Sequence, residues 1–486
     1  MTTRTGYLLA IDVGSTTTRA VLFDLAGTQV AEAFREPVVH HPEPNWAEVQ
    51  PDDWWRDCTA TIRELLARSG IPADRILGIG LTALQHTLVP VDAQGNVLAP
   101  AILWMDQRSK DQLAWLNREH AAVIAELLGG TGKLSNSTAV PKLRWMLEHT
   151  PEVLEQAEMF LPVKDFIRYR LTGLAGTDAY DAANTGLVCR PTGTWFAPLL
   201  TLVGVHPDRM PPILEAGAIA GHVTQKAARE TGLAAGTPVA VGSGDVNCTC
   251  IGTNVTDDGR ACLYLGTAAW IRIPCPSRPG GTVRATATTG AALKWVTDLF
   301  ACSGFYTPLL GEAAEVPPGS RGLLFLPHLM GERGPQPDPD ARGTLYGLTL
   351  AHGRADITRA VLEGCAYQLL RIVEDCGGPP LREMAVVGGG AKSPLWLDII
   401  ADVLGIRLVI PQVREAGALG AAILAGVGVG VYKDARLAAT KLTRIERAHD
   451  PDSTRHALYR RNYKRFVALE RGVSPLYSGS DSRGVS

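Results

Sequence analysis

Two segments of this sequence share the pattern that most constrains its fold: an apolar strand, a tight turn of glycine and hydroxyl residues, and a second strand. The first is YLLAIDVGSTTTRAVLFD (7–24), and the second is ACLYLGTAAWIRIP (261–274). Each predicts an antiparallel hairpin. Because the pattern occurs once in each half of the chain without a fixed period, we expect two units of similar design.

The length of the chain also favours two domains. A chain of 486 residues exceeds what one hydrophobic core usually holds. A hydrophobic content of 46% with 20% charged residues is typical of globular proteins, so each domain has enough apolar residues for a core. We expect a first domain over 1–255, a second over 256–440, and a C-terminal helical extension with a disordered tail over 441–486.

Charge and hydropathy exclude two classes of partner. Lys and Arg total 47 against 49 Asp and Glu, so no strong field attracts nucleic acid or an anionic membrane. The apolar patch before Asp12 is too short for a signal peptide. The uncharged run AGALGAAILAGVGVGVY (416–432) is Gly-rich and short of a membrane span, and it predicts a small-residue helix packed tightly on a sheet. Nine scattered cysteines predict neither a disulfide framework nor a zinc site. We expect a cytoplasmic protein that binds neither nucleic acid nor membrane. A homodimer is compatible with the sequence.

Periodicity and end signals predict further elements in the first half. Residues 51–70 predict a helix with an acidic first turn and a glycine stop, and residues 76–84 predict a buried strand. Residues 89–109, VPVDAQGNVLAPAILWMDQRS, predict a hairpin that ends on a polar strand tip. Residues 137–149 open a helix with Pro141 near its first turn. The fold class is therefore α/β, with a sheet that is antiparallel at one edge.

The second half shows the same mixture. Residues 356–377 predict a long helix N-capped by Asp356. Residues 384–405 predict a buried strand, a triple glycine and a helix, and residues 407–426 predict a last strand and helix.

The turn DVGSTTTR in the first hairpin suits a phosphate group. Gly14 lets the backbone come close to a ligand, and successive N–H groups and hydroxyls match phosphate oxygens. Asp12 ends the strand and could hold a cation or its waters. An ordinary β-turn has the same composition, so the motif alone leaves both interpretations open. Gly266 and Thr267 give the second hairpin a similar turn, and two such turns could grip a polyphosphate from opposite sides.

The stretch VVGGGAKSPLW ends a buried strand with Gly388, Gly389 and Gly390. Because these glycines have no side chains, a flat ring could lie on their backbone, and the N-terminus of the helix that follows favours an anion. A tight strand-to-helix connection needs glycines as well. The stretch is no GxGxxG fingerprint, and it lies far from any first βαβ unit, which disfavours a nicotinamide fold.

Two polar clusters follow predicted strands of the first half. One holds Gln85 and His86, and the other holds Trp104, Asp106 and Arg108. Planar donors and acceptors beside an aromatic platform suit a sugar. Each residue taken singly is as well explained as a satisfied polar residue of the core or surface.

The stretch VAVGSGDVNC (239–248) places one carboxylate, Asp245, among small and apolar residues. An aspartate that caps the next helix would explain it. A general base that takes a proton from a hydroxyl would explain it too, because Gly242, Ser243 and Gly244 leave room for a substrate. Its place near the expected domain junction, where ligand sites are common, suits the second interpretation, but the spacing alone leaves both open.

These motifs, in this order, resemble the FGGY family of carbohydrate kinases from Leu8 to about Val429. The most specific element is GTLYGLTLAHGRADITRAVLEG (343–364), which is similar to the second family signature. STAVPKLRWMLEH is similar to the first signature, with Ala139 where Pro, Ser or Thr is usual. PHLMGERGPQPDPDARG is similar to a further family stretch.

The resemblance implies two ribonuclease-H-like domains of the actin, hexokinase and sugar-kinase ATPase type, with a cleft between them. It implies phosphorylation of a sugar or polyol hydroxyl by ATP with Mg²⁺, and Asp245 as the proton acceptor. It further implies that Asp12 and Asp245 lie near the metal and that polar residues of the first half, with Asp245, contact the acceptor. The expected acceptor contacts are Gln85, His86, Trp104, Asp106, Arg108 and Asp245. The expected nucleotide contacts are Gly14, Ser15, Thr16, Thr17, Arg19, Gly266, Thr267, Gly389, Gly390, Ala391 and Ser393.

The layout is most similar to pentulose kinases of the family, which implies an acceptor such as D-xylulose. Leu84 stands where those kinases usually have Gln, and Gln85 stands where they usually have Met. Ribulose, erythritol, gluconate or glycerol therefore stay open as acceptors, although the Arg-Glu pair of glycerol kinases is absent. A non-sugar ATPase of the same superfamily, or a sugar sensor without turnover, are the remaining alternatives.

Overall fold

The structure is a computed structural model that describes residues 6–256, 259–275, 278–300, 306–334, 337–377 and 380–479. The chain divides into two compact units. The first unit comprises Met1–Asn254 with Glu415–Thr443, and the second comprises Val255–Arg414 with Arg444–Ser486. Each contains a mixed six-stranded sheet with helices packed on it, as the predicted α/β class requires.

This division differs from the expected domains 256–440 and 441–486. Helix α15 (Ala416–Gly428) packs on strands β1 and β5 of the first unit, so the segment Glu415–Thr443 belongs there. Strand β22 (Ile445–His449) pairs antiparallel with β21 (Arg407–Pro411), so the segment from Arg444 belongs to the second unit. The packing of small residues and the pairing of strands, rather than the order along the chain, thus determine the unit to which each segment belongs. Residues 480–486 of the expected tail lie outside the described residues.

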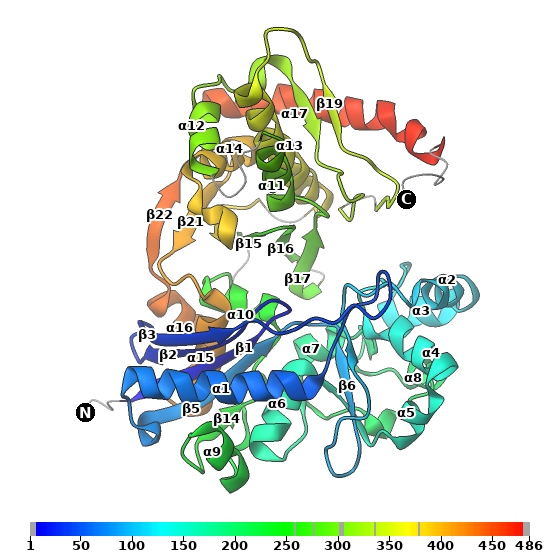
Figure 1. Cartoon of the computed structure of the whole chain (residues 1–486), viewed down its shortest axis with the longest axis vertical. Helices are drawn as coiled ribbons and strands as arrows, with labels where there is room; N and C mark the ends of the chain where they lie inside the picture. Colours follow the sequence, from blue (N-terminus) through cyan, green and yellow to red (C-terminus); the bar gives the residue numbers. More distant parts are fainter. Residues whose placement is uncertain are drawn as a thin grey trace. The chain divides into compact units, whose positions relative to one another are not determined.

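The sheet of the first unit has the strand order β13-β14-β5-β1-β2-β3 (Figure 1). Its strands are β1 (Tyr7–Val13), β2 (Thr18–Asp24), β3 (Gln29–Arg35), β5 (Ile76–Ala83), β13 (Ile219–His222) and β14 (Pro238–Ala240). β1 and β2 form the predicted hairpin, with Asp12 opposite Arg19. β5 runs parallel to both β1 and β14, whereas β2 and β3 are antiparallel, so the sheet is antiparallel at one edge as predicted.

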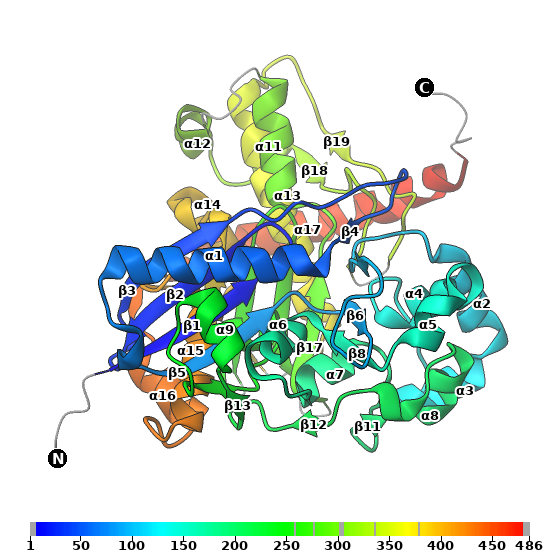
Figure 2. The same ribbon diagram turned by 60° about the horizontal axis from the view of Figure 1, so that its bottom comes forward.

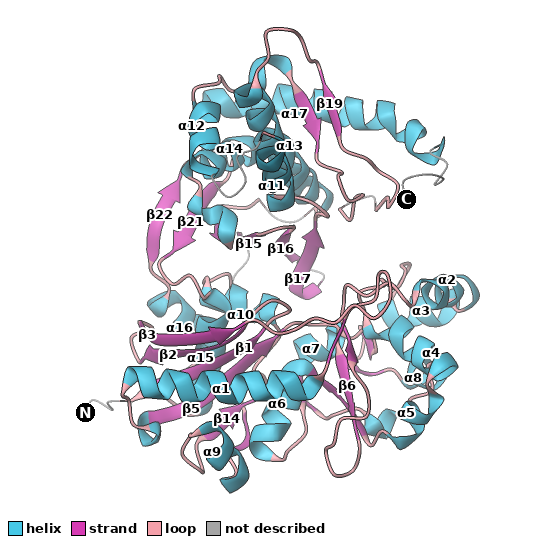
Figure 3. Cartoon of the chain, viewed as in Figure 1, coloured by secondary structure: helices cyan, strands magenta, loops and turns pink. Residues whose placement is uncertain are grey.

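Helices cover both faces of this sheet (Figure 3). In β5, Ile79 and Leu81 join the apolar cluster that contains Trp54 of α1 (Pro51–Ser69). Gly78 and Gly80, which alternate with them, face α15 instead. Because successive side chains of a strand point to opposite faces, α1 and α15 lie on opposite sides of the sheet.

Glycines let α15 approach its neighbours closely. A Cβ on Gly80 would clash with the carbonyl oxygen of Ala421 in α15. A Cβ on Gly420 would clash with the carbonyl oxygen of Cys248 in α10 (Asp245–Gly252). The predicted small-residue helix on a sheet is confirmed.

We expect Gly80→Ala to lower the free energy of unfolding by about 1–3 kcal/mol, because the added methyl group meets backbone rather than a movable side chain. Urea denaturation followed by circular dichroism measures this. Gly472→Ala is the control, since no atom lies within 4 Å of its added methyl group. Equal stability of the two variants would contradict the close packing of α15.

Outside the sheet the first unit is mainly helical, and the helices of residues 110–156 and 197–202 share a second apolar cluster. Figure 2 shows these helices to one side of the sheet. The other helices of the unit are α2 (Lys110–Glu119), α3 (Ala121–Leu128), α4 (Ala139–His149), α5 (Pro151–Gln156), α6 (Val163–Thr172), α7 (Ala179–Asn184), α8 (Ala197–Leu202), α9 (Gln225–Thr231) and α16 (Ala435–Leu442). Its short strands are β4 (Glu48–Val49), β6 (Leu88–Val91), β7 (Ala101–Ile102), β8 (Met159–Pro162), β9 (Thr177–Asp178), β10 (Val188–Cys189), β11 (Thr194–Trp195) and β12 (Ile213–Leu214).

The predicted hairpin over residues 89–109 forms only next to its turn, where Val91 pairs antiparallel with Val97 and the Leu98 N–H donates to the Pro90 carbonyl at 3.1 Å. The turn itself forms, because the Asp92 carboxylate accepts the N–H groups of Gln94 and Asn96. The flanking strands then pair elsewhere: β6 with β8, and β7 with β4. Long-range pairing therefore overrides a correct local turn signal.

The sheet of the second unit has the order β17-β16-β15-β20-β21-β22. Its strands, besides β21 and β22, are β15 (Arg260–Leu265), β16 (Ala269–Cys275), β17 (Arg278–Ala285) and β20 (Glu383–Val387). The other elements are α11 (Gly290–Leu299), α12 (Tyr306–Ala314), β18 (Leu324–Leu326), β19 (Thr344–Tyr346), α13 (Arg354–Asp375), α14 (Pro394–Leu404) and α17 (Ser453–Val473). β15 and β16 form the second predicted hairpin.

Helix α13 begins earlier than predicted. Its N-cap is Gly353, so Asp356 is the third helical residue and not the cap. The Asp356 carboxylate accepts the Gly353 N–H at 2.9 Å, which is the reciprocal half of a capping box. An acidic residue three positions into a helix stabilises its start as a cap does, and so the sequence signal was misplaced by one turn.

Across the described ranges, no helix is both long and apolar enough to cross a membrane.

Candidate active site

Three parallel strands of the first unit end at the same edge of its sheet. β1 ends at Val13, directly after Asp12, and β5 is followed by Gln85 and His86. β14 leads through residues 241–244 to Asp245, the first residue of α10. The Leu84 N–H donates to the Val13 carbonyl at 2.8 Å, which ties the first two strand ends together. The structure therefore gathers most of the residues predicted for the first domain at one edge, where ligands of α/β sheets usually bind.

Asp12 and Asp245 are the two carboxylates at this edge of the sheet, and the charge of Asp245 acts on Asp12. Burial raises the pKa of Asp12 to about 7; Arg19 opposes this rise, and Asp245 and Glu415 add to it. Burial also raises the pKa of Asp245 to about 6, although the Val246 N–H, 2.8 Å from Asp245 Oδ1, opposes it. The N-cap of α10 is Gly244, so Asp245 does not cap that helix. Two buried carboxylates at one edge favour a cation or a proton donor beside them.

The turn between β1 and β2 holds Gly14 to Thr17. The Gly14 N–H donates to the Thr17 carbonyl at 2.8 Å, which closes the turn, while the Thr16 side chain is exposed. Ser15 Oγ accepts from the indole N–H of Trp104 at 3.3 Å. Arg19 pairs with Glu415, the residue before α15. The turn thus presents hydroxyls beside Asp12, whereas Arg19 already has an acidic partner.

Gln85 and His86 lie where β5 ends. His86 adopts a left-handed backbone conformation, with φ of 68°, and its Nδ1 lies 2.5 Å from the Asn184 carbonyl oxygen. Nδ1 therefore carries the proton and donates, which fixes the orientation of the ring. Gln85 is buried, and the added Cβ of a residue larger than glycine at position 244 would clash with its amide nitrogen. Gln85 thus lies directly beside the residue that precedes Asp245.

Asp106 and Arg108 are largely engaged with each other and with nearby residues. Asp106 is fully buried and accepts the Ala47 N–H at 2.6 Å as well as the Arg108 guanidinium. Arg108 also binds Glu48 at 2.8 Å and lies 3.6 Å above the Trp46 ring. This pair holds the segment 45–48 in place, and the acceptor contact expected of both residues stays a prediction.

A buried ion cluster next to Asp245 was missed by the sequence analysis. Lys164 Nζ lies 2.8 Å from Asp165, 3.1 Å from Asp178 and 3.4 Å from Asp181, and all four side chains are at most 4% exposed. Burial would lower the pKa of Lys164, but these three carboxylates raise it above its ordinary value. Asp178 also accepts the Ser243 hydroxyl at 2.6 Å, two residues before Asp245. The cluster thus anchors the segment that carries the proposed base.

A weak signal for this cluster exists in the sequence. Lys164 and Arg168 lie four residues apart in a helix whose other residues include Phe166, Ile167 and Leu171, all buried. Two cations on one face of a mostly buried helix require acidic partners elsewhere in the chain. Only the fold shows that Asp178 and Asp181 supply them.

The second unit brings its two predicted segments together. β15 and β20 are parallel neighbours, so Gly266 and Gly388 follow adjacent strand ends. Gly388 has φ of 94°, and a Cβ on it would lie 2.8 Å from the Leu265 carbonyl oxygen. The Gly290 N–H donates to the Gly266 carbonyl at 2.9 Å, which places the start of α11 on this loop. Thr267 and the triple glycine thus share one edge of the sheet.

The residues of the triple-glycine stretch differ in the space around them. Apart from its chain neighbours, no described atom lies within 4 Å of a Cβ added to Gly389, whereas one added to Gly390 would clash with Leu265. Ser393 caps α14, because its hydroxyl accepts the Trp396 N–H at 3.3 Å. Ala391 is buried. Gly389 is therefore the residue of this stretch best placed to let a flat ring lie on the backbone.

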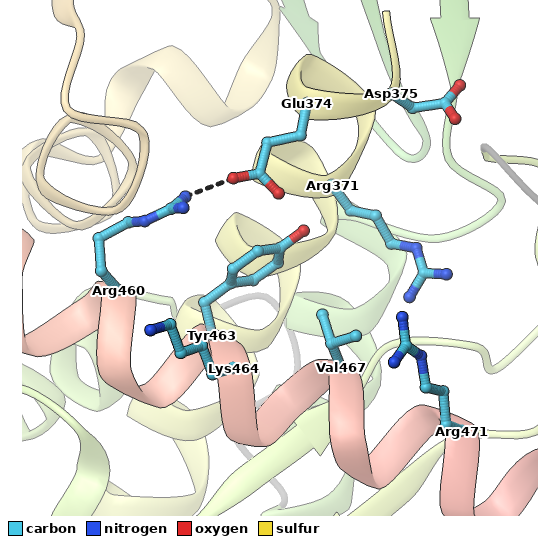
Figure 4. A pocket seen from close by; sticks show the side chains of 8 residues that line it. All are labelled: Arg371, Glu374, Asp375, Arg460, Tyr463, Lys464, Val467 and Arg471. Atoms are coloured by element: carbon cyan, nitrogen blue, oxygen red, sulfur yellow. Dashed lines mark hydrogen bonds and ion pairs between the residues drawn. The ribbon is translucent and has the colours of Figure 1, made fainter.

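A hollow of about 540 Å³ lies between α13 and α17 of the second unit (Figure 4). Side chains of both charge signs line it, and Arg460 binds Glu374 across it at 2.5 Å. It contains no residue predicted to bind nucleotide or acceptor, and we assign no part of the site to it. Among the described side chains, no group of three or more His, Cys, Asp or Glu could hold a metal.

Family models decide the class of this protein. The N-terminal domain of the FGGY family of carbohydrate kinases matches residues 7–252, and the C-terminal domain of that family matches residues 268–429. The chain belongs to this family. It is thus an FGGY carbohydrate kinase, a phosphotransferase with an alcohol group as acceptor, and the expected enzyme class and fold class are confirmed.

Similar proteins of known name cover nearly the full length of this FGGY kinase. Xylulose kinase of Escherichia coli K12 is 30% identical over 96% of this chain and 99% of its own. Autoinducer-2 kinase of Salmonella choleraesuis is 29% identical over 97% and 96%. The crystal structure of xylulose kinase from Rhodospirillum rubrum has a TM-score of 0.89 and 31% identity, covering 97% of this chain and all of that one. Relatives of similar identity thus carry names with different substrates.

Proposed function

We propose that this FGGY kinase transfers the terminal phosphate of ATP to a hydroxyl of a pentulose such as D-xylulose, with Asp245 as general base. The observation that carries the proposal is the place of the Asp245 carboxylate, whose charge raises the pKa of Asp12, at the common end of three parallel strands. Similarity to xylulose kinases supports the pentulose.

In this proposal the acceptor lies against Gln85, His86 and Trp104. The Asp245 carboxylate takes the proton of the acceptor hydroxyl while its oxygen forms a bond to the terminal phosphorus, and the bond from that phosphorus to ADP breaks. Asp106 and Arg108 position the neighbouring loop. Exclusion of water from the site prevents the hydrolysis of ATP.

The carboxylates fit a role beside Mg²⁺, which usually binds one or two carboxylates together with phosphate oxygens and water. Asp12 and Asp245 would hold it, and the Asp245 carboxylate would also take the acceptor proton. Bound Mg²⁺ neutralises charge on the phosphate oxygens. Gly14 to Thr17 and Gly266 with Thr267 would bind those oxygens, and Gly389 to Ala391 the adenosine.

An ATP-consumption screen tests the proposal with D-xylulose, D-ribulose, erythritol, gluconate and glycerol. We expect D-xylulose to give the largest kcat/KM. ATP turnover that no acceptor stimulates would identify an ATPase instead, and binding of an acceptor without turnover would identify a sensor. A larger kcat/KM with another acceptor would correct the substrate but keep the mechanism. The cytoplasmic location and the homodimer stay predictions.

The second candidate acceptor class is supported by a specific departure at position 85. Gln85 is buried, and its amide nitrogen has no hydrogen-bond partner among the described residues, so this strand end has one more polar group than an apolar side chain would give. Similarity to autoinducer-2 kinase shows that relatives of this length and identity carry other names. Ribulose, erythritol, gluconate or glycerol in place of D-xylulose is therefore the alternative that the screen is designed to detect.

We expect Gly389→Val to raise KM for ATP by about 10-fold or more, because the new side chain would occupy the space we assign to adenine, a loss of about 1.4 kcal/mol or more of binding. KM for the acceptor should change much less. The protein should fold normally, since the position is open. Steady-state kinetics with ATP varied gives the answer, and an unchanged KM for ATP would remove the adenosine assignment.

A further inference from the structure

Lys142 is a buried cation that takes no part in the proposed chemistry. It lies near the start of α4 and is 3% exposed, and no described carboxylate oxygen lies within 4.0 Å of its ammonium group. Burial lowers the pKa of Lys142 to about 7, an effect that Asp106 opposes and Arg108 reinforces. A buried charge without a carboxylate partner is costly, so we ask what its hydrogen bonds hold in place.

The ammonium group binds the loop that precedes α4. Lys142 Nζ donates to the Asn136 carbonyl at 2.5 Å and to the Thr138 carbonyl at 3.2 Å. An ammonium group has three donors, and these two carbonyls account for two of them. Lys142 thus fixes the backbone of residues 136–138 from inside the fold.

Asn136 extends this restraint to the segment 104–109. Its amide nitrogen donates to the Asp106 carbonyl at 2.7 Å, and its amide oxygen accepts the Ser109 hydroxyl at 3.2 Å. One side chain therefore holds this segment at two points, on either side of Arg108. Trp104, which the proposed function places against the acceptor, lies in the same segment.

The start of α4 also supports His86. The Ala139 N–H donates to the Thr185 carbonyl at 3.0 Å, and the carbonyl of the preceding residue, Asn184, fixes the His86 ring. Lys142 and His86 line one hollow of about 20 Å³, which is enough for about one water molecule. Both polar clusters of the first unit are thus connected to residues 136–139.

We propose that Lys142 is a positioning residue for the acceptor, which holds the two polar clusters of the first unit in place through Asn136 and the start of α4. The inference rests on the proposed function, because it takes those clusters as the acceptor site. Lys142 itself need not touch the acceptor. Its ammonium group binds two carbonyls of the loop at once, whereas an apolar side chain of similar length would leave the loop without this attachment.

Steady-state kinetics of Lys142→Met tests the inference. We expect KM for the acceptor to rise about 10-fold or more, the loss typical of a hydrogen bond to a charged group, while kcat and KM for ATP change less than about 2-fold. The probe is D-xylulose, or the acceptor that gives the largest kcat/KM in the screen. A role in folding alone would lower the amount of active protein, so that the apparent kcat falls and both KM values stay unchanged. That result would overturn the inference.

A second variant tests the same contacts from the other end. Asn136→Ala removes both hydrogen bonds to the segment 104–109 but keeps the Lys142 side chain. If Lys142 acts through Asn136, the double variant should raise KM for the acceptor no further than the larger of the two single changes. Losses that multiply would mean that the two residues act independently, which contradicts the inference. Should Lys142→Met not fold, Lys142→Gln, which keeps one donor group, takes its place in the cycle.

Lys133→Met is the matched control, because Lys133 is exposed in the same connection between α3 and α4. It should keep the wild-type KM for both substrates, and the same rise in KM for the acceptor as in Lys142→Met would overturn the inference.

The outcomes separate this inference from the proposed function. If no acceptor of the screen stimulates ATP consumption by wild type, the proposed function fails, and the inference fails with it. If an acceptor is phosphorylated and Lys142→Met keeps the wild-type KM for it, only the inference is overturned.

Discussion

Asp245→Asn should lower kcat by about 10²- to 10⁴-fold while the protein stays folded and still binds its acceptor. That range is the usual contribution of a positioned general base, and the amide cannot take the acceptor proton. The carboxylate lies at the start of α10, where its charge raises the pKa of Asp12, and its surroundings are fixed by Ser243 and Asp178. Initial rates of ADP formation with the best acceptor of the screen measure the effect.

The control for this variant is Asp74→Asn, an equally conservative change at an exposed position of the same unit. It should keep wild-type turnover. Circular dichroism and calorimetric binding of the acceptor show whether Asp245→Asn keeps its fold and its affinity. Near-normal turnover in that variant would mean that Asp245 is not the base.

Lys164→Met should destabilise the first unit by about 3–5 kcal/mol. The substitution removes the central cation from three carboxylates, and an uncompensated buried charge is costly even when the new side chain fills the volume. Urea denaturation followed by tryptophan fluorescence measures this, since Trp54 and Trp55 lie in the core of the same unit.

Lys226→Met is the matched control, because Lys226 is exposed on α9. It should change stability by about 0.5 kcal/mol or less, as surface substitutions usually do. A combined change of Lys164→Met with Asp181→Asn should recover part of the loss, because it removes one of the carboxylates left unpaired. Equal stability of Lys164→Met and wild type would show that the cluster does not hold this part of the fold.

The positions of the central strands and of the site could be predicted from the sequence because local signals carry them. The strand, glycine turn and strand of residues 7–24 form as predicted, and so does the glycine-rich connection after β20. Asp245 stood out because it is a single carboxylate among small residues, a pattern that needs no partner elsewhere in the chain to be noticed.

The features that sequence reasoning missed depend on contacts between distant segments. Lys164 and Asp165 are neighbours in sequence and look like an ordinary surface pair. In the fold they are buried, and Lys164 contacts Asp178 and Asp181. Asp106 and Arg108 are residue types that suit a sugar site. In the fold, Asp106 accepts the Ala47 N–H and Arg108 pairs with Glu48. The turn at Asp92 forms, while the strands beside it find partners far away in the chain.

The packing of the segment Glu415–Thr443 in the first compact unit could not be predicted from the sequence for the same reason. The segment that contains α15 follows the nucleotide segment in the chain, but its small residues fit only against the glycines of β5 and α10. The only sequence pattern of such close packing is a run of Gly and Ala. That run predicts a tight contact, but it does not predict which segment makes the contact.

The most direct test of the central claim is to identify the product. Wild-type protein and Asp245→Asn are incubated side by side with ATP, Mg²⁺ and D-xylulose, and phosphorus NMR follows the phosphate. We predict that wild type forms a sugar phosphate ester whose phosphorus couples to protons of one acceptor carbon, while Asp245→Asn forms it about 100-fold more slowly or worse. Release of inorganic phosphate with no ester, or equal ester formation by both proteins, would contradict the account.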